Sequence, residues 1–133
     1  MKNDQIICIF IEEDLNRGNL NVLHETIHPS YQYQSPTEIM NGPDELAAFV
    51  VAFREAFPDL NIAVLEQIHA GESVVTRIRF TGTHLGQFLD LPPTGKSVIV
   101  EGCIISKFKE GLICEEWEIL DNLTLLQQLG VSA

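Results

Sequence analysis

Three short stretches of this 133-residue chain say most about its fold. TGTHLG at residues 81–86 ends a run rich in β-branched residues, PPTGK at residues 92–96 ends the loop that follows, and WEILD at residues 117–121 ends the last such run. Glycine and proline mark turns, whereas β-branched residues favour strands. The pattern predicts long strands on both sides of an ordered loop, with a lone acid, Asp121, after the last strand.

The other elements follow from apolar spacing around these stretches. Helical spacing predicts helices over residues 4–17 and near 21–26, and a third that begins at Gly42-Pro43 and ends at Pro58-Asp59. Alternation predicts a short extended piece at 31–36 and strands at 60–69, 73–83, 98–108 and 112–120, before a closing helix at 123–129. Helices first and antiparallel strands afterwards predict one α+β domain over residues 1–133.

Composition narrows the classes of partner. The formal net charge is −11, with only eight Lys and Arg, so we expect no nucleic-acid partner and no binding to anionic membranes. No apolar run is long enough to span a bilayer. The three cysteines have neither a disulfide framework nor metal-ligand spacing, and no phosphate-binding loop is visible. We therefore expect a cytoplasmic protein without a metal or other cofactor.

Asp121 is the first candidate for chemistry. On a strand its side chain would share a face with Trp117. An aromatic neighbour of low polarity would raise the pKa of the carboxyl group, which suits general acid/base work on a carbon acid. The alternative is that Asp121 caps the helix that begins near Leu123.

Other side chains form a second tier of candidates. His84 could bind a substrate carbonyl, or its ring could bond to backbone and hold the turn. Tyr33 could donate a hydrogen bond to a developing enolate. Glu101 would be a second pocket carboxylate if it faces inward, and Phe53 and Phe57 lie on the apolar face of the helix that begins at residue 42.

The order of these motifs resembles the SnoaL-like polyketide cyclases, a branch of the fold shared with nuclear transport factor 2 and ketosteroid isomerase, from about residue 42 to 130. The resemblance implies a cone-shaped α+β barrel with a pocket between a curved antiparallel sheet and the N-terminal helices. It also implies that Asp121 is the acid/base of an intramolecular aldol ring closure. From the residues themselves we take His84 as the second catalytic candidate. We expect a small hydrophobic carbonyl compound to be bound by Trp117, Tyr33, Phe53, Phe57 and Glu101.

One departure from the family leaves the reaction open. The cyclases use a histidine on the strand before the catalytic aspartate, where this chain has Ser106 and Lys107. Three interpretations therefore stand: a cofactor-free cyclase or isomerase, a non-catalytic module that binds a hydrophobic ligand, and a structural protein that dimerises through its sheet. A catalyst needs Asp121 unpaired and with a raised pKa, whereas a binding module does not.

Two further expectations concern the surface. We expect a homodimer, because the sheet face away from the helices carries β-branched residues that a monomer would expose: Val75, Ile78 or their neighbours, depending on the register. We expect the loop at residues 84–96 to be ordered, because it is rich in apolar residues and stiffened by two prolines. Its Phe88 should pack near the entrance of the cone or at the dimer contact.

Overall fold

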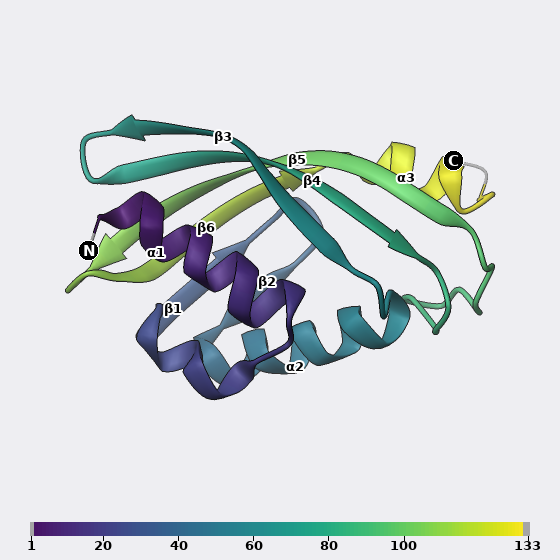
Figure 1. The fold of residues 1–133 in the computed structure, drawn as a ribbon, viewed down its shortest axis with the longest axis horizontal. Helices are drawn as coiled ribbons and strands as arrows, with labels where there is room; N and C mark the ends of the chain where they lie inside the picture. The colour runs from purple at the N-terminus through teal and green to yellow at the C-terminus, as the bar shows by residue number, and fades with distance from the viewer. Residues whose placement is uncertain (1, 132–133) are drawn as a thin grey trace.

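The computed structural model describes residues 2–131 and packs helices against a curved, open six-stranded sheet (Figure 1). The helices α1 and α2 lie on the same side of the sheet. No helix within residues 2–131 has the length and apolar character needed to cross a membrane. In chain order the elements are α1 (Asn3–Ile9), the π-helical η1 (Phe10–Asn16), the 3₁₀ helix η2 (Leu20–Glu25), β1 (Ile27–Gln34), β2 (Ile39–Asn41), α2 (Gly42–Ala56), β3 (Asn61–Ala70), β4 (Ser73–Thr83), β5 (Ser97–Lys109), β6 (Leu112–Leu120) and α3 (Asn122–Gln128).

The predicted α+β class and the four long strands are confirmed, and the sheet has two further strands: β1, which the sequence pattern showed only in part, and β2, which it did not show. The strand order is β2-β1-β6-β5-β4-β3, so β2 and β3 are the edges. The extended piece expected at 31–36 is part of β1, which pairs in parallel with β6 and places Tyr33 opposite Glu116. This single parallel pairing places the first strand of the chain beside the last.

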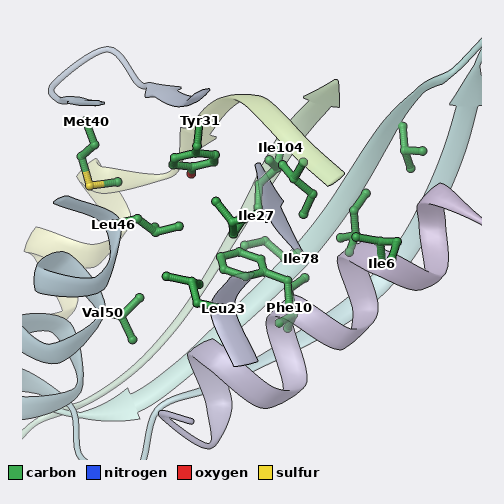
Figure 2. Close-up of a cluster of buried hydrophobic side chains, with 14 residues drawn as sticks. Ile6, Phe10, Leu23, Ile27, Tyr31, Met40, Leu46, Val50, Ile78 and Ile104 are labelled. Atoms are coloured by element: carbon green, nitrogen blue, oxygen red, sulfur yellow. The ribbon is translucent and has the colours of Figure 1, made fainter. Parts of the chain in front are cut away.

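The core has one large cluster that joins the N-terminal helices to the sheet (Figure 2). Phe10 of η1 and Val50 of α2 meet Ile78 and Ile104 of the sheet there, and all four side chains are buried. A second cluster, at the other end, joins the end of α2 to the sheet and to α3. The helices are therefore held to the sheet mainly by burial of apolar area.

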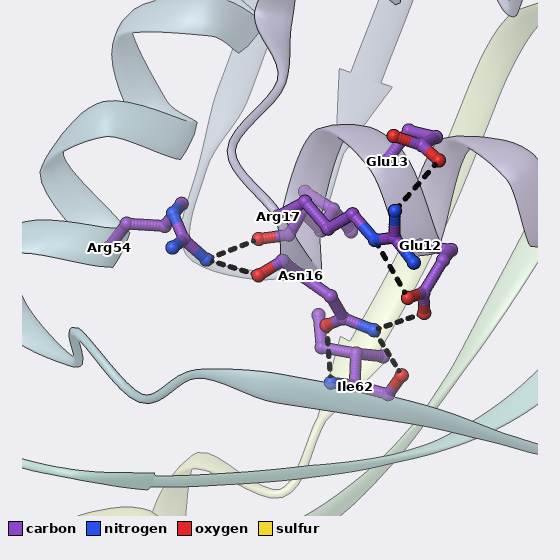
Figure 3. Close-up of polar contacts among 7 residues, drawn as sticks. Glu12, Glu13, Asn16, Arg17, Arg54 and Ile62 are labelled. Atoms are coloured by element: carbon purple, nitrogen blue, oxygen red, sulfur yellow. Dashed lines mark hydrogen bonds and ion pairs between the residues drawn. The ribbon is translucent and has the colours of Figure 1, made fainter.

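Polar contacts fix the end of η1 against α2 and β3 (Figure 3). Nη1 of Arg54 donates hydrogen bonds to the carbonyl oxygens of Leu15, at 2.9 Å, and Asn16, at 2.6 Å. The side-chain amide of Asn16 accepts from the backbone N–H of Ile62 at 2.7 Å and donates to its carbonyl oxygen at 3.0 Å. These bonds satisfy carbonyl groups that a helix end leaves free, and they hold in place Leu15, which lines the cavity described below.

Asp14, also in η1, is a fully buried acid. Its Oδ2 accepts a hydrogen bond from the Thr26 hydroxyl at 3.2 Å, and its Oδ1 has no partner among the residues that the structure describes. Burial is the main reason why the pKa of Asp14 rises to about 6, although the bond from Thr26 opposes the change. The carboxyl group therefore ionises less readily in the folded protein than in the unfolded chain, and its ionised form destabilises the fold.

We expect Asp14→Asn to stabilise the protein at neutral pH. Because the pKa of Asp14 in the folded state, about 6, lies above the 3.8 of an unperturbed aspartate, its favourable contribution is complete below pH 3.8 and is lost as pH rises through 6. Asparagine does not ionise, so the free energy of unfolding should rise by about 1–2 kcal/mol at pH 7.5 and change little at pH 4. Urea unfolding at both pH values measures this. Asp90→Asn removes the same charge at an exposed site, and an equal gain in that control would contradict the explanation.

The outer face of the sheet carries an apolar row across four strands. The strand register aligns Ile68, Val75, Ile105 and Trp117, and Ile105 and Trp117 are 44% and 43% exposed. The charged residues on this face are three acids and four bases: Glu66, Glu101, Glu115, Arg77, Arg79, Lys107 and Lys109. Acids and bases thus nearly balance here in a chain whose formal charge is −11, and a second copy would meet little net repulsion at this face.

The homodimer through this outer face stays a prediction. Sedimentation at micromolar concentration should give twice the 14.9 kDa of one chain. Trp117→Glu should shift the protein to the monomer, because it places a charge in the apolar row. Val51→Glu, at a 46% exposed position of α2, should leave the dimer intact. A monomeric native protein would contradict the prediction.

Candidate functional site

A cavity of about 430 Å³ lies between α2 and the inner face of the sheet. One wall is aromatic, because α2, β4 and the loop at residues 84–96 contribute Phe49, Phe53, Phe80 and Phe88. Neighbouring rings of this wall are in contact, with Phe53 centred 5.0 Å from Phe80 and 6.0 Å from Phe88. The size and the apolar lining are those of a site for a small organic molecule.

Two tyrosine–glutamate pairs form the polar part of this cavity. Glu116 and Glu118 both project from the inner face of β6 into the cavity. The Tyr31 hydroxyl donates to Oε1 of Glu116 at 2.6 Å, and the Tyr33 hydroxyl donates to Oε1 of Glu118 at 2.5 Å. Side chains two apart on a strand share a face, so the parallel pairing of β1 with β6 sets the two tyrosines beside the two acids.

Burial shifts the proton affinity of all four groups. It is the main cause that raises the pKa of Glu116 to about 7, against the opposing bond from Tyr31. It also raises the pKa of Glu118, where the bond from Tyr33 opposes and the charge of Glu38 adds to the change. The pKa values of Tyr31 and Tyr33 are raised by burial first and by the neighbouring acids second, so both phenols remain hydrogen-bond donors.

The two glutamates also affect each other. The negative charge of Glu118 raises the pKa of Glu116, because adjacent like charges disfavour double ionisation. Near neutral pH the pair therefore holds a proton in the cavity. One carboxylate that accepts a proton and one carboxylic acid that donates a proton are the two groups that general acid/base catalysis needs.

Every charged residue among those that line the cavity is an acid. These residues are Glu38, Glu116 and Glu118, and the lining includes no lysine, arginine or histidine. Glu38 is exposed together with Thr37 and Leu89, so these three residues mark the opening. A negatively charged ligand would meet repulsion at the opening and find no cation inside.

The structure contradicts the predicted position of Asp121. Its carboxylate is exposed and caps α3, with Oδ1 accepting from the backbone N–H of Thr124 at 3.1 Å and Oδ2 accepting from its hydroxyl at 2.6 Å. These bonds lower the pKa of Asp121, whereas a cavity acid was expected to have a raised one. The helix N-terminus, which leaves backbone N–H groups free, therefore determines where this side chain lies.

Trp117 and Glu101 are also wrong as cavity residues, because both point to the outer face of the sheet. Trp117 lies in the exposed apolar row. Glu101 accepts hydrogen bonds from Arg77 at 3.4 Å and from Arg79 at 3.2 Å. Side chains of β6 do alternate between the two faces, as predicted, but the inner face is the one that carries Glu116 rather than Trp117.

His84 and Phe57 lie behind the cavity wall and do not line the cavity. Nδ1 of His84 accepts from the backbone N–H of Thr94 at 3.2 Å and lies 2.9 Å from the Thr94 hydroxyl. The buried Phe57 packs on the His84 ring, with centroids 5.5 Å apart. The interpretation of His84 as the residue that holds its turn is thus confirmed, and the catalytic placement is wrong.

Three predicted positions agree with the structure. Tyr33 and Phe53 line the cavity, and Phe88 lies in the wall near the opening. The sequence pattern does not indicate the acids Glu116 and Glu118, because charged residues are usually exposed and the apolar side of β6 is therefore predicted to face inward. Their signal was the shared period of two, since tyrosines at positions 31 and 33 match acids at 116 and 118.

Comparison with known proteins identifies the family of this chain. Residues 6–129 match the family model described as SnoaL-like polyketide cyclase. The chain belongs to the SnoaL-like polyketide cyclase family. A relative in Streptomyces sp. (strain C5), the aklanonic acid methyl ester cyclase DauD, is 29% identical over 82% of this chain and 67% of its own. The aklanonic acid methyl ester cyclase DnrD of Streptomyces peucetius is 26% identical over 89% of this chain and 84% of its own.

Solved structures agree with the sequence matches. TsrD from Streptomyces laurentii superposes with a TM-score of 0.88 at 26% identity and covers 97% of this SnoaL-like chain and 95% of its own. IdmH from Streptomyces antibioticus has a TM-score of 0.85 at 28% identity and covers 98% of this chain and all of its own. The expected fold, a curved sheet wrapped on helices, is therefore that of the family.

Proposed function

We propose that this SnoaL-like protein catalyses proton transfer at carbon in a neutral aromatic carbonyl compound, as in an intramolecular aldol ring closure. The observation that carries the proposal is the pair of buried glutamates, each hydrogen-bonded to a phenol, inside an apolar cavity. Membership of a cyclase family and the names of the two methyl ester cyclases support the same class of reaction.

Glu118 is the base in this proposal. It is less enclosed than Glu116 and lies close enough to Glu38, at the opening, to respond to its charge. Its carboxylate takes a proton from the carbon next to a carbonyl group, and the electron pair of the broken C–H bond forms an enolate. The enolate oxygen accepts a hydrogen bond from the Tyr33 hydroxyl or from protonated Glu116.

Glu116 is the acid. When the enolate carbon attacks a second carbonyl group of the same molecule, the new C–C bond leaves an alkoxide that needs a proton. Glu116, enclosed beside Tyr31 with a pKa of about 7, supplies that proton, and the proton held by Glu118 restores the pair. No atom is lost, so the product is an isomer of the substrate.

The lining of the cavity limits the substrate. The aromatic wall favours a flat aromatic molecule, because offset and edge-on ring contacts are favourable. The three lining acids disfavour a free carboxylate. A neutral keto ester is therefore expected to bind at least about tenfold more tightly than the matching keto acid, since like charges at a binding site are repulsive.

The test uses an aromatic β-keto ester and its free acid in D₂O. Isothermal titration measures both dissociation constants, and NMR measures deuterium uptake at the carbon between the carbonyl groups. The proposal predicts tighter binding of the ester and an exchange rate that rises with protein concentration. Equal binding of the free acid would overturn the assignment of substrate charge, and the absence of protein-dependent exchange in a bound ester would overturn the catalytic assignment.

The second candidate function is a module that only holds a hydrophobic ligand. The apolar cavity alone supports this function. The two buried acids argue against it, because burying carboxyl groups is unfavourable and a holding site gains nothing from their raised pKa values. A ligand-holding module would bind the ester without exchanging its protons.

A further inference from the structure

Two buried hydroxyl groups lie next to the polar part of the cavity without hydrogen-bond partners. Ser106 on β5 and Thr76 on β4 are fully buried, and neither side-chain oxygen has a partner among the described residues. A buried hydroxyl without a partner is rare and costly in folded proteins. Two of them on one sheet face therefore require an explanation.

The strand register places an acceptor beside Ser106. Its cross-strand partners are Val74 on β4 and Glu116 on β6, so the carboxyl group of Glu116 is the polar group directly across from it. Thr76 pairs with Ile104, two residues before Ser106, which makes its hydroxyl the diagonal neighbour on the same face. Directly paired side chains on one face of a sheet are close enough to interact.

We propose that the Ser106 hydroxyl is the second hydrogen-bond donor to Glu116, beside Tyr31, and thereby a positioning residue for proton transfer in the cavity. The ionised carboxylate takes two donors, Tyr31 and Ser106. When Glu116 is protonated, its own O–H is free to donate to a substrate in the cavity, and the bond from Ser106 weakens because the carboxyl group is then neutral.

The groups around Glu116 support this role for a neutral donor. The titratable residues that face it are Tyr31 and Tyr33 from β1 and Glu118 from β6. The neighbour of Ser106, Lys107, is exposed on the opposite face of β5. With no cation among these groups, hydrogen-bond donors are left to stabilise the charged form, as the Tyr31 hydroxyl does. A Ser106 hydroxyl turned toward Glu116 would lower the pKa of that carboxyl group in the same way.

The experiment titrates Glu116 directly, without substrate, in protein labelled with ¹³C at the glutamate carboxyl carbons. Glu116→Gln and Glu118→Gln assign the two cavity signals. We expect Ser106→Ala to move the midpoint of the Glu116 titration upward by roughly one pH unit, because this shift corresponds in free energy to the loss of one hydrogen bond to a charged group. The Glu118 signal should change less. Thr76→Val removes a neighbouring buried hydroxyl but keeps the proposed donor, Ser106. It should shift the midpoint of the Glu116 titration by less than half as much.

Two results would overturn the proposal: an unchanged Glu116 midpoint in Ser106→Ala, or an equal shift in Thr76→Val. If Ser106→Ala does not fold, Ser106→Cys keeps the shape with a weaker donor and should shift the midpoint in the same direction. The proposal rests on Glu116 as the cavity acid, but the titration needs no turnover. An unchanged midpoint would thus reject the role of Ser106 alone, and active Glu116→Gln and Glu118→Gln variants would reject the proposed function.

Discussion

Glu118→Gln is expected to lower kcat/KM by about 10²–10⁴-fold for an aromatic keto ester that the wild-type protein converts, because this is the usual contribution of a general acid/base group. Glutamine has nearly the same shape, and its carbonyl oxygen can still accept the bond that Tyr33 now donates to Glu118 at 2.5 Å. The variant therefore loses the proton acceptor while the cavity keeps its form, and the dissociation constant of the ester should change little. Steady-state kinetics and titration calorimetry on the same preparation measure the two quantities.

The matched control is Glu101→Gln, which makes the same chemical change on the outer face, where Glu101 binds Arg77 and Arg79. Its kcat/KM should remain within about twofold of the wild type, because an exposed ion pair contributes little. A Glu118→Gln variant that is as active as this control would refute the assignment of the base.

Phe57→Ala is expected to lower the free energy of unfolding by about 3–5 kcal/mol, as for other fully buried phenylalanines. Phe57 has no exposed surface, and its ring contacts Phe80 at 5.1 Å, Phe88 at 5.4 Å and His84 at 5.5 Å between centroids. The truncation removes the group that joins the end of α2 to β4 and to the loop at residues 84–96. Urea unfolding measures the loss.

The same variant should loosen that loop. Backbone amides at residues 85–91 should exchange with solvent faster than in the wild type, because Phe88 loses the ring against which it packs. Leu123→Ala, at a position that is 53% exposed, should cost less than about 0.5 kcal/mol. A loss in Phe57→Ala no larger than that of Leu123→Ala would contradict the structural role of Phe57.

The sequence was enough to predict most of the fold, because the apolar periodicity of each long element is strong. The turn at residues 109–111 is an example: Glu110 and Gly111 both have positive φ, of 55° and 76°, as a tight hairpin turn requires. The three-residue β2 and the parallel pairing of β1 with β6 carry no comparable local signal. Both depend on contacts between residues far apart in the chain.

The site was harder to predict, because β6 inverts the usual rule that acids face water. Its inner positions hold Glu116 and Glu118, and its outer positions hold Trp117 and Ile119. The rule fails here for a physical reason: two tyrosine hydroxyls satisfy the buried acids, and the apolar outer row is continuous with its neighbours on β5. Neither fact is visible until β1 is placed beside β6.

Asp121 illustrates the same limit at a single residue. Its place after an apolar strand fits both a cavity acid and a helix cap, and the second interpretation is the one that the structure confirms. The choice depends on where the chain turns, since the first residues of α3 present free N–H groups at that point. Leu120, one residue earlier, is the last side chain of β6 that lines the cavity.

The most direct measurement compares deuterium uptake by a bound aromatic keto ester in two variants, Glu118→Gln and Asp121→Asn, at equal occupancy and at the pH of highest wild-type exchange. Glu118→Gln should lose about two or more orders of magnitude in exchange rate, and Asp121→Asn should keep the wild-type rate, because Asp121 only caps α3 from the surface. Retained exchange in Glu118→Gln together with lost exchange in Asp121→Asn would contradict the cavity glutamates as the site of proton transfer.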